Sequence, residues 1–260
     1  MNPSDLKGPF DLIICPGAWT PARHWEGVGR MLSQAQGQAD LRGISAVQWP
    51  GTAPAGLLEH RDAVLAQVAA TSGSDSDAPL VLTGHSFGAF PMLEAAAELG
   101  ERVAGLIFID AFLPDYGRSI FSQSEGRSGP RIMREQAAQN GGMVPPPDPS
   151  IWGLGTATDD GADAPGALPP QPLFPQSLEV FEEPLSDAAL QAFNDAQKRA
   201  YFSASRNGNN PFKRAFDGLD GRADWFTVQI EGGHLLHVDR PAALAYWCAQ
   251  FLRLVAGRRF

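Results

Sequence analysis

Cysteine is scarce in this sequence, which contains only Cys15 and Cys248 among 260 residues. Two cysteines cannot build a disulfide framework, and a chain without such a framework suits a reducing compartment. The sequence also lacks any run of about 18 apolar residues, so no membrane span is expected. Its first ten residues, MNPSDLKGPF, are too polar for the apolar centre of a signal peptide. We therefore expect a cytoplasmic protein without a membrane partner.

Basic residues are also few, because 20 lysines and arginines stand against 29 aspartates and glutamates, for a formal net charge of -9. Without a basic surplus the chain cannot neutralise many phosphates, which argues against a nucleic-acid partner. Hydrophobic residues make up 43% of the chain and charged residues 19%, which is ordinary for a globular protein. A chain of this length can bury one large core, and its composition leaves the oligomeric state open.

Short apolar segments alternate with helical ones over much of the chain. The expected strands are residues 10–15, 80–83, 103–109, 199–204 and 225–230. Helices are expected at residues 57–70 and 87–99 and from Pro241 through Trp247 to Phe251. Strands that alternate with helices in this way form parallel sheets, which are buried on both faces. The sequence therefore predicts an α/β fold with a mostly parallel central sheet and helices on both faces.

The alternation stops between residues 114 and 197, where no strand is convincing. Ten prolines fall between Met143 and Pro184, which would suit a disordered insertion. Apolar anchors in the same stretch argue instead for an ordered cap, helical at both ends. These anchors are Trp152, Leu154, Phe174, Leu178, Val180 and Phe181. We expect residues 1–113 and 198–260 to form the core, and residues 114–197 to form a cap, or lid, over a site.

A serine between two glycines, Gly84-His85-Ser86-Phe87-Gly88, follows one expected strand and precedes an expected helix. A nucleophile elbow requires this arrangement, because its serine adopts a strained backbone and side chains at the glycine positions would collide with the neighbouring strand and helix. Backbone amide groups at the start of the helix favour developing negative charge. The alternative is a glycine-rich turn, but the flanking strand and helix favour Ser86 as a nucleophile.

A serine hydroxyl needs a base that removes its proton. The histidines of the chain are His24, His60, His85, His234 and His237. Only His234 follows a late strand, on the turn Gly232-Gly233, just before the last helix, where this architecture supplies its base. The spacing of His234 and His237 would suit a metal pair, but no third ligand of the right kind is nearby, so no metal is expected. His85 is expected to pack away from the hydroxyl of Ser86. His24 and His60 are expected to lie on the surface or at a pocket rim.

A carboxylate should complete the site by holding the imidazole in one tautomer and stabilising its cation. The usual source is the turn after the strand at 199–204, but residues 205–210 contain neither aspartate nor glutamate. Asp110, at the carboxyl end of the strand at 103–109, keeps the chain order serine, acid, histidine that the fold requires. Asp110 is therefore the expected acid, with a strand-end cap as its alternative role. The fallback acids are Asp217, Asp220 and Asp224.

Two backbone N–H groups should stabilise the oxyanion of an acyl-transfer intermediate. The first is expected on Phe87, directly after the nucleophile, and the second on Ala18, in the turn Pro16-Gly17-Ala18-Trp19 after the first strand. The candidate pocket walls are aromatic: Trp19, Trp25, Phe87, Phe112 and Trp152. Aromatic side chains are more often part of a core than of a pocket. Each of these five residues is therefore a separate candidate for the pocket wall.

Several segments resemble the α/β-hydrolase superfamily and, within it, the small esterases related to plant methylesterases and hydroxynitrile lyases and their bacterial relatives. They are Pro16–Trp25, Gly84–Gly88, Ile109–Gly117 and Gly233–His234 with Asp239–Pro241. The resemblance covers most of the chain apart from the cap, and it implies Ser86 as nucleophile and His234 as base. Bacterial relatives with an Asp-Ala-Phe segment often lack an acid in the later turn, which supports Asp110.

Two features depart from this branch. Pro16-Gly17 stands where the branch commonly has His-Gly. Hydroxynitrile lyases have a threonine at the place of Gly17 and a lysine at that of Leu235, so lyase chemistry is not expected. Ser86 also excludes the haloalkane dehalogenases and epoxide hydrolases, which need an aspartate nucleophile.

The expected activity is hydrolysis of a carboxylic ester or lactone, apolar and of small to medium size, through an acyl-enzyme and without a cofactor. Two alternatives use the same fold. In cofactor-independent dioxygenases a histidine and an aspartate after the same strand act, and Ser86 would only bind substrate. Non-catalytic members, such as hormone receptors, bind a ligand without turnover. An intact Ser86 and His234 favour the serine hydrolase.

Overall fold

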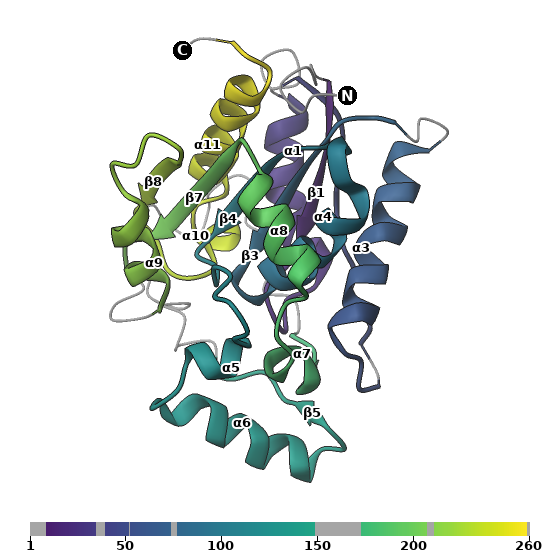
Figure 1. Ribbon diagram of the computed structural model, residues 1–260, viewed down its shortest axis with the longest axis vertical. Helices are drawn as coiled ribbons and strands as arrows, with labels where there is room; N and C mark the ends of the chain where they lie inside the picture. Colours follow the sequence, from purple (N-terminus) through teal and green to yellow (C-terminus); the bar gives the residue numbers. More distant parts are fainter. Residues whose placement is uncertain are drawn as a thin grey trace.

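The computed structural model describes residues 9–34, 40–51, 53–73, 77–148, 173–206 and 211–258. Its centre is a six-stranded sheet in the order β2-β1-β3-β4-β7-β8, in which every neighbouring pair is parallel. The strands are β1 (Phe10–Cys15), β2 (Leu41–Ala46), β3 (Leu80–His85), β4 (Val103–Ile109), β7 (Arg199–Ala204) and β8 (Phe226–Ile230). Helices cover both faces of this sheet (Figure 1). The predicted α/β fold with a mostly parallel sheet is confirmed.

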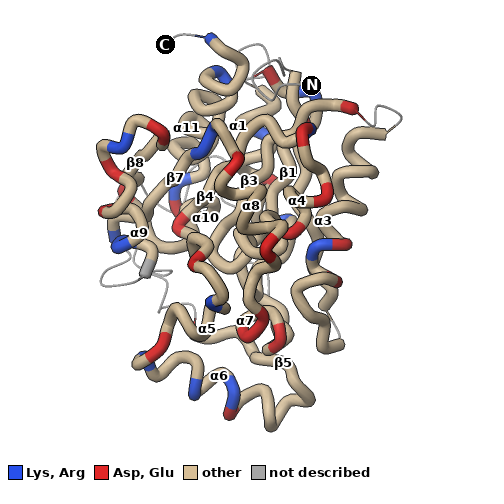
Figure 2. Tube along the Cα trace, viewed as in Figure 1, with Lys and Arg blue, Asp and Glu red and all other residues tan. Residues whose placement is uncertain are grey.

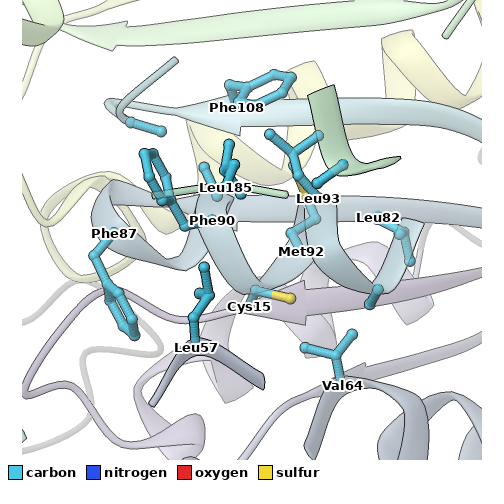
Figure 3. Close-up of a cluster of buried hydrophobic side chains, with 14 of the residues drawn as sticks. Cys15, Leu57, Val64, Leu82, Phe87, Phe90, Met92, Leu93, Phe108 and Leu185 are labelled. Atoms are coloured by element: carbon cyan, nitrogen blue, oxygen red, sulfur yellow. The ribbon is translucent and has the colours of Figure 1, made fainter. Parts of the chain in front are cut away.

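Two hydrophobic clusters lie on opposite faces of the sheet, because successive residues of a strand point in opposite directions. In β1, Ile13 and Cys15 belong to one cluster, whereas Leu12 and Ile14 belong to the other. The first cluster joins the sheet to α3 (Leu57–Ser72), α4 (Ala89–Leu99) and α8 (Asp187–Asp195), and the second joins it to α1 (Glu26–Gln34) and α11 (Pro241–Val255). Figure 3 shows side chains of α3 and α4 meeting those of β1, β3 and β4 in the first cluster.

The elements outside the expected strands and helices include β2, α1 and α9 (Pro211–Leu219). Strand β2 pairs only with β1, and of its six residues only Leu41 is buried. An edge strand of this kind needs no continuous apolar run, so hydrophobicity alone does not reveal it. No helix in the described ranges is both long and apolar enough to cross a membrane.

The chain between β4 and β7 includes the segment predicted to form the cap. Its described elements are α5 (Ile120–Gln123), α6 (Ser128–Gln139), β5 (Met143–Val144), β6 (Gln176–Ser177), α7 (Glu179–Glu182) and α8. In Figure 1, α5, α6, β5 and α7 lie together beyond one end of the sheet, whereas α8 packs against α4. Trp152 falls within residues 149–172, which lie outside the described residues. The division of the chain at residues 114 and 197 stays a prediction.

A buried carboxylate connects this segment to the helical layer of the sheet. Glu94 of α4 is only 5% exposed and accepts two hydrogen bonds from Ser186, one from its backbone N–H at 2.7 Å and one from its hydroxyl at 2.8 Å. Ser186 is also the N-cap of α8, where its hydroxyl accepts a bond from the N–H of Ala189 at 3.1 Å. The start of α8 is therefore positioned by a side chain of α4.

His60 makes a second buried connection, between α3 and β6. Its Nδ1 donates to the carbonyl of Gly56 at 2.7 Å, and its Nε2 lies 2.8 Å from the side-chain amide nitrogen of Gln176. Burial lowers the pKa of His60, so the neutral ring accepts from that amide at Nε2. The expectation of a surface or rim position is wrong for this histidine, which is fully buried.

The Glu94 connection leads to a stability prediction. In the variant Glu94→Ala, both donors of Ser186 lose a buried acceptor, which should lower the free energy of unfolding by about 2 kcal/mol. Urea unfolding followed by circular dichroism measures the change. The matched control is Glu98→Ala, on the same helix but exposed, whose bond to Arg61 is long at 3.5 Å. The Glu98→Ala substitution should lower the free energy of unfolding by less than about 1 kcal/mol. Equal losses of stability in the two variants would contradict a special role for Glu94.

Candidate active site

Ser86 lies at a strained turn between β3 and α4, in the short 3-10 helix η3 (Ser86–Gly88), with a backbone φ of +54°. Two glycines permit this turn. A Cβ at Gly84 would lie 2.5 Å from the Cα of Ala89, and a Cβ at Gly88 would lie 2.4 Å from the carbonyl oxygens of Cys15 and Pro16. Side chains at either glycine would collide with the following helix or with the end of β1, as a nucleophile elbow requires.

Asp110 and His234 meet through a short hydrogen bond. Asp110 directly follows β4, is fully buried and has a φ of +40°. One carboxylate oxygen accepts from Nδ1 of His234 at 2.7 Å, and the other accepts from the backbone N–H of Ala204 at 3.1 Å. A buried carboxylate at Nδ1 holds the proton on that nitrogen, so Nε2 is the ring atom suited to accept a proton.

The three fallback acids lie in other surroundings and are all exposed. Asp217 pairs with Lys213 at 2.6 Å, and Asp224 pairs with Arg222 at 2.9 Å. Asp220 accepts from the hydroxyl of Thr227 at 3.0 Å. Of the four candidate acids, the structure brings Asp110 to His234.

Aromatic and backbone contacts fix the imidazole of His234. Its ring stacks on Phe212 with centroids 5.0 Å apart and an interplanar angle of 6°. Its carbonyl oxygen accepts from Nε2 of His85 at 2.9 Å, and the preceding N–H, of Gly233, donates to Asp239 at 2.9 Å. The ring and the backbone of His234 are therefore held from separate directions.

His85 has a larger role than the packing expected from the sequence. Its ring is fully buried, beside the rings of His234 at 4.7 Å and His237 at 5.0 Å. Burial, with a contribution from the neighbouring His234, holds the pKa of His85 well below its ordinary value. The ring is therefore neutral and donates its Nε2 proton to the carbonyl of His234. The Gly-His-Ser sequence alone contains no sign of this bond, which joins residues 149 positions apart.

A cavity of about 600 Å³ opens beside Ser86 and His234. It is lined by Gly17, Ala18, Trp19, His85, Ser86, Phe87, Phe112, Ile120, Phe121, Ser124, Arg127, Ser128, Gly129, Pro130, Met133, Phe181, Phe212, His234 and Leu235. The expected oxyanion residues, Ala18 and Phe87, therefore border the same cavity as Ser86, as do the expected walls Trp19 and Phe112. The residues on α5, α6 and α7 show that the predicted cap region contributes a large part of the lining.

Trp25 is not among the residues that line this cavity. It belongs to the cluster on the α1 and α11 face of the sheet, where it stacks on His237 with centroids 4.2 Å apart and an interplanar angle of 8°. Its edge also meets His85 at 5.8 Å. Trp25 therefore lies behind His85, while Trp152, the other expected tryptophan wall, lies outside the described residues.

The turn that contains Ala18 is closely packed against the elbow. A Cβ at Gly17 would lie 2.5 Å from Nδ1 of His85 and 3.2 Å from the Cβ of Ser86. The carbonyl of Gly17 accepts from the hydroxyl of Thr20 at 2.7 Å, and Trp19 has a φ of +64°. A threonine at position 17, as in hydroxynitrile lyases, would not fit here without moving His85.

The described residues offer no grouping of three or more His, Cys, Asp or Glu side chains that could hold a metal ion. His234 is bonded to Asp110, whereas His237 stacks on Trp25. The two rings of the HxxH sequence therefore lie in different surroundings.

A parallel sheet, a strained serine turn after β3 and a histidine after β8 define the class of this protein, an α/β hydrolase. The chain belongs to the alpha/beta hydrolase family, whose sequence model matches residues 12–245. The resemblance inferred from the sequence is therefore confirmed at the level of the superfamily.

Proteins similar to this chain include enzymes named as an esterase and as a hydrolase. The carbendazim hydrolyzing esterase of Nocardioides sp. (strain SG-4G) is 24% identical over 174 residues, which cover 64% of this chain and 68% of the relative. A pyrethroid hydrolase from Sphingobium faniae JZ-2 has 20% identity and a TM-score of 0.65, over 94% of this chain and 97% of its own.

Another structure shares the fold over nearly the whole chain. It is an extracellular alpha/beta-hydrolase from a Paenibacillus species, described as sharing structural and functional homology with tobacco salicylic acid binding protein 2. It has 16% identity and a TM-score of 0.67, over 96% of this chain and 100% of its own. At such low identity the two structures share the fold alone.

Because buried histidines lie beside the candidate site, the stability of the folded protein should depend on pH. Burial, followed by the nearby rings of His85, His24 and His234, holds the pKa of His237 well below 6.5 in the folded protein. Below pH 6.5 the unfolded chain therefore binds a proton at this residue that the folded chain does not bind, and acid favours unfolding. The free energy of unfolding should fall as the pH decreases from 6.5, by up to about 1.4 kcal/mol per pH unit for each such histidine.

The variant His237→Phe isolates the contribution of this histidine, because phenylalanine can stack on Trp25 without titrating. Urea unfolding at pH 7 and pH 5 should show a smaller loss of stability in the variant than in the wild type, by up to about 1.4 kcal/mol per pH unit. The same loss in both proteins would mean that His237 is not held neutral.

Proposed function

We propose that this protein is a serine hydrolase that cleaves a carboxylic ester or lactone through an acyl-enzyme. The observation that supports it best is the 2.7 Å hydrogen bond between Asp110 and His234, beside a cavity that Ser86 also lines. An imidazole held by a buried carboxylate is suited to removing a hydroxyl proton, and Ser86 is the hydroxyl placed at the strained turn.

In the first half of the proposed reaction, the Oγ atom of Ser86 attacks the carbonyl carbon while Nε2 of His234 takes the hydroxyl proton. Asp110 stabilises the resulting imidazolium, and the backbone N–H groups of Phe87 and Ala18 stabilise the oxyanion. The bond between the carbonyl carbon and the leaving oxygen then breaks, and that oxygen receives the proton from His234. The products are an acyl-Ser86 ester and an alcohol, which stays attached to the acyl group when the substrate is a lactone.

In the second half, a water molecule attacks the acyl-enzyme while His234 takes one of its protons. The bond between the acyl carbon and Oγ of Ser86 breaks, His234 returns the proton to Oγ, and the carboxylic acid leaves. No cofactor enters either half of this reaction, because proton transfer and a serine nucleophile are sufficient for acyl transfer.

The lining of the cavity supports an apolar substrate of small to medium size. A cavity of about 600 Å³ is within the usual range for small-molecule sites. Aromatic side chains make up much of the wall, among them Phe112, Phe121 and Phe212. A relative named as a carbendazim hydrolyzing esterase supports ester hydrolysis, and a structural neighbour named as a pyrethroid hydrolase supports hydrolysis. We also propose a cytoplasmic location, which the two buried, unpaired cysteines support.

Two substitutions test this mechanism through hydrolysis of p-nitrophenyl butyrate. Ser86→Ala should reduce kcat by at least about 10⁴-fold, because the nucleophile is lost. Asp110→Asn should reduce it by about 10⁴-fold, because the amide favours the wrong tautomer of His234. The control Asp217→Asn changes an exposed fallback acid and should leave kcat within about twofold. A fluorophosphonate should label the wild type and not the Ser86→Ala variant.

The outcome also separates the competing functions. Oxygen uptake that persists in Ser86→Ala and disappears in Asp110→Asn would identify a cofactor-independent dioxygenase instead. Ligand binding without turnover in the wild type would identify a non-catalytic member of the family.

His85 is expected to act as a positioning residue for His234, since its Nε2 donates to the backbone of that residue. In His85→Met this donor is lost at similar volume, and kcat should fall about tenfold with little change in KM. His85→Gln places an amide N–H at the same distance along the side chain and should restore most of kcat. Similar kcat values in the two variants, with melting temperatures matched, would show that the ring serves only for packing.

A further inference from the structure

The cavity beside Ser86 is lined by residues of different chemistry. The turn after β1 and the elbow contribute small and reactive residues, and aromatic and aliphatic side chains make up most of the rest. The chain before α6 and the first turns of that helix add Gly129, Pro130 and Met133 together with three polar residues, Ser124, Arg127 and Ser128. Apart from His85 and His234, Arg127 is the one ionisable side chain among the described residues that line this cavity, since they include no Asp, Glu or Lys.

Arg127 differs from the other arginines of this region. Figure 2 shows both basic and acidic residues on α6 and in the chain between α5 and α6, and three of the arginines of this region are paired with carboxylates. Arg118 lies 3.0 Å from Asp115, Arg131 lies 2.6 Å from Glu135, and Arg134 lies 2.6 Å from Glu182. Among the described ion pairs none includes Arg127, which is exposed at the edge of the cavity.

We propose that Arg127 is a specificity-determining residue that binds a carboxylate at the far end of the substrate. The substrate class is then an ester with an apolar body and one anionic end, such as the monoester of a dicarboxylic acid. This assignment rests on the proposed function, which places the reacting ester bond at Ser86. The apolar body lies along the aromatic wall, and the anionic end lies at the polar edge of the cavity.

The charge balance favours a carboxylate over a phosphate monoester. A guanidinium group forms two parallel hydrogen bonds with a carboxylate and neutralises one negative charge. A phosphate monoester carries about -1.5 to -2 charges at neutral pH. No second unpaired cation lines the described cavity, and the net charge of the chain is -9, so the additional negative charge would be uncompensated.

Matched pairs of substrates test this inference. Each pair joins a p-nitrophenyl half-ester of a dicarboxylic acid, from succinic to suberic, to the p-nitrophenyl ester of the monocarboxylic acid of equal chain length. The measured quantity is the ratio of kcat/KM for the anionic ester to that for the neutral ester. At low ionic strength Arg127→Gln should lower this ratio about three- to tenfold, most strongly at one chain length. Added salt should lower it in the wild type.

Two further variants distinguish a specific contact from a general effect of charge. Arg131→Gln removes the same charge from α6, the helix that begins directly after Arg127, at an exposed residue that does not line the cavity beside Ser86. This variant should leave the ratio within twofold of the wild type. Arg127→Glu should lower the ratio further than Arg127→Gln. Equal ratios in the wild type and Arg127→Gln would overturn the proposal, as would equal losses in Arg127→Gln and Arg131→Gln.

Binding to a Ser86→Ala background separates this proposal from the proposed hydrolysis. Titration calorimetry with the same ester pairs should show preference for the anionic ester, lost when Arg127→Gln is added. Preference that depends on Arg127 without any turnover in the wild type would overturn the hydrolase and retain the carboxylate contact. Turnover that depends on Ser86, with no preference at any chain length, would retain the hydrolase and overturn the contact.

Discussion

The buried carboxylate of Asp110 connects three parts of the chain that are distant in sequence. It follows β4, accepts from Ala204 at the end of β7, and accepts from His234 after β8. A charged group removed from water is costly unless its oxygens accept hydrogen bonds. Both oxygens of Asp110 accept such bonds. The carboxylate therefore fixes the position of His234 relative to Ala204 at the end of β7.

Tyr201 stabilises the backbone directly after Asp110. Its hydroxyl accepts from the N–H of Ala111 at 3.1 Å and donates to the carbonyl of Ala111 at 2.8 Å. Burial, with the nearby charge of Asp110, raises the pKa of Tyr201 well above its ordinary value, so the hydroxyl keeps its proton. The backbone that presents Asp110 to His234 is thus fixed by a neutral side chain that cannot compete for the imidazole proton.

Backbone strain is concentrated around the cavity. Among the described residues other than glycine, positive φ angles occur at Trp19, Asp40, Ser86 and Asp110, and all of these except Asp40 belong to the candidate site. Each such conformation costs about 1 to 2 kcal/mol, and it persists where the surrounding packing allows no alternative. Here Gly17 and Gly88 provide that packing, because they let the end of β1 contact the elbow directly.

Much of this protein was predictable from local sequence. Alternating apolar strands and helices predicted the parallel sheet, because residues buried on both faces of a central strand must be apolar. The glycines around Ser86 and the Gly-Gly turn before His234 predicted the two positions that line one cavity. The absence of an acid from residues 205–210 favoured Asp110 as the carboxylate partner of His234. Edge strand β2 was missed because half-exposed residues need not be apolar.

Only the tertiary structure decided how these residues meet. The bonds from His234 to Asp110 and to His85 join positions more than a hundred residues apart, and no local pattern encodes such a distance. Trp25 and Trp19 were equivalent as aromatic residues in the sequence, yet one packs in the core behind His85 and the other lines the cavity. Local residue types thus determined which chemistry was available. The convergence of parallel strand ends at one edge of the sheet determined which of those residues share a site.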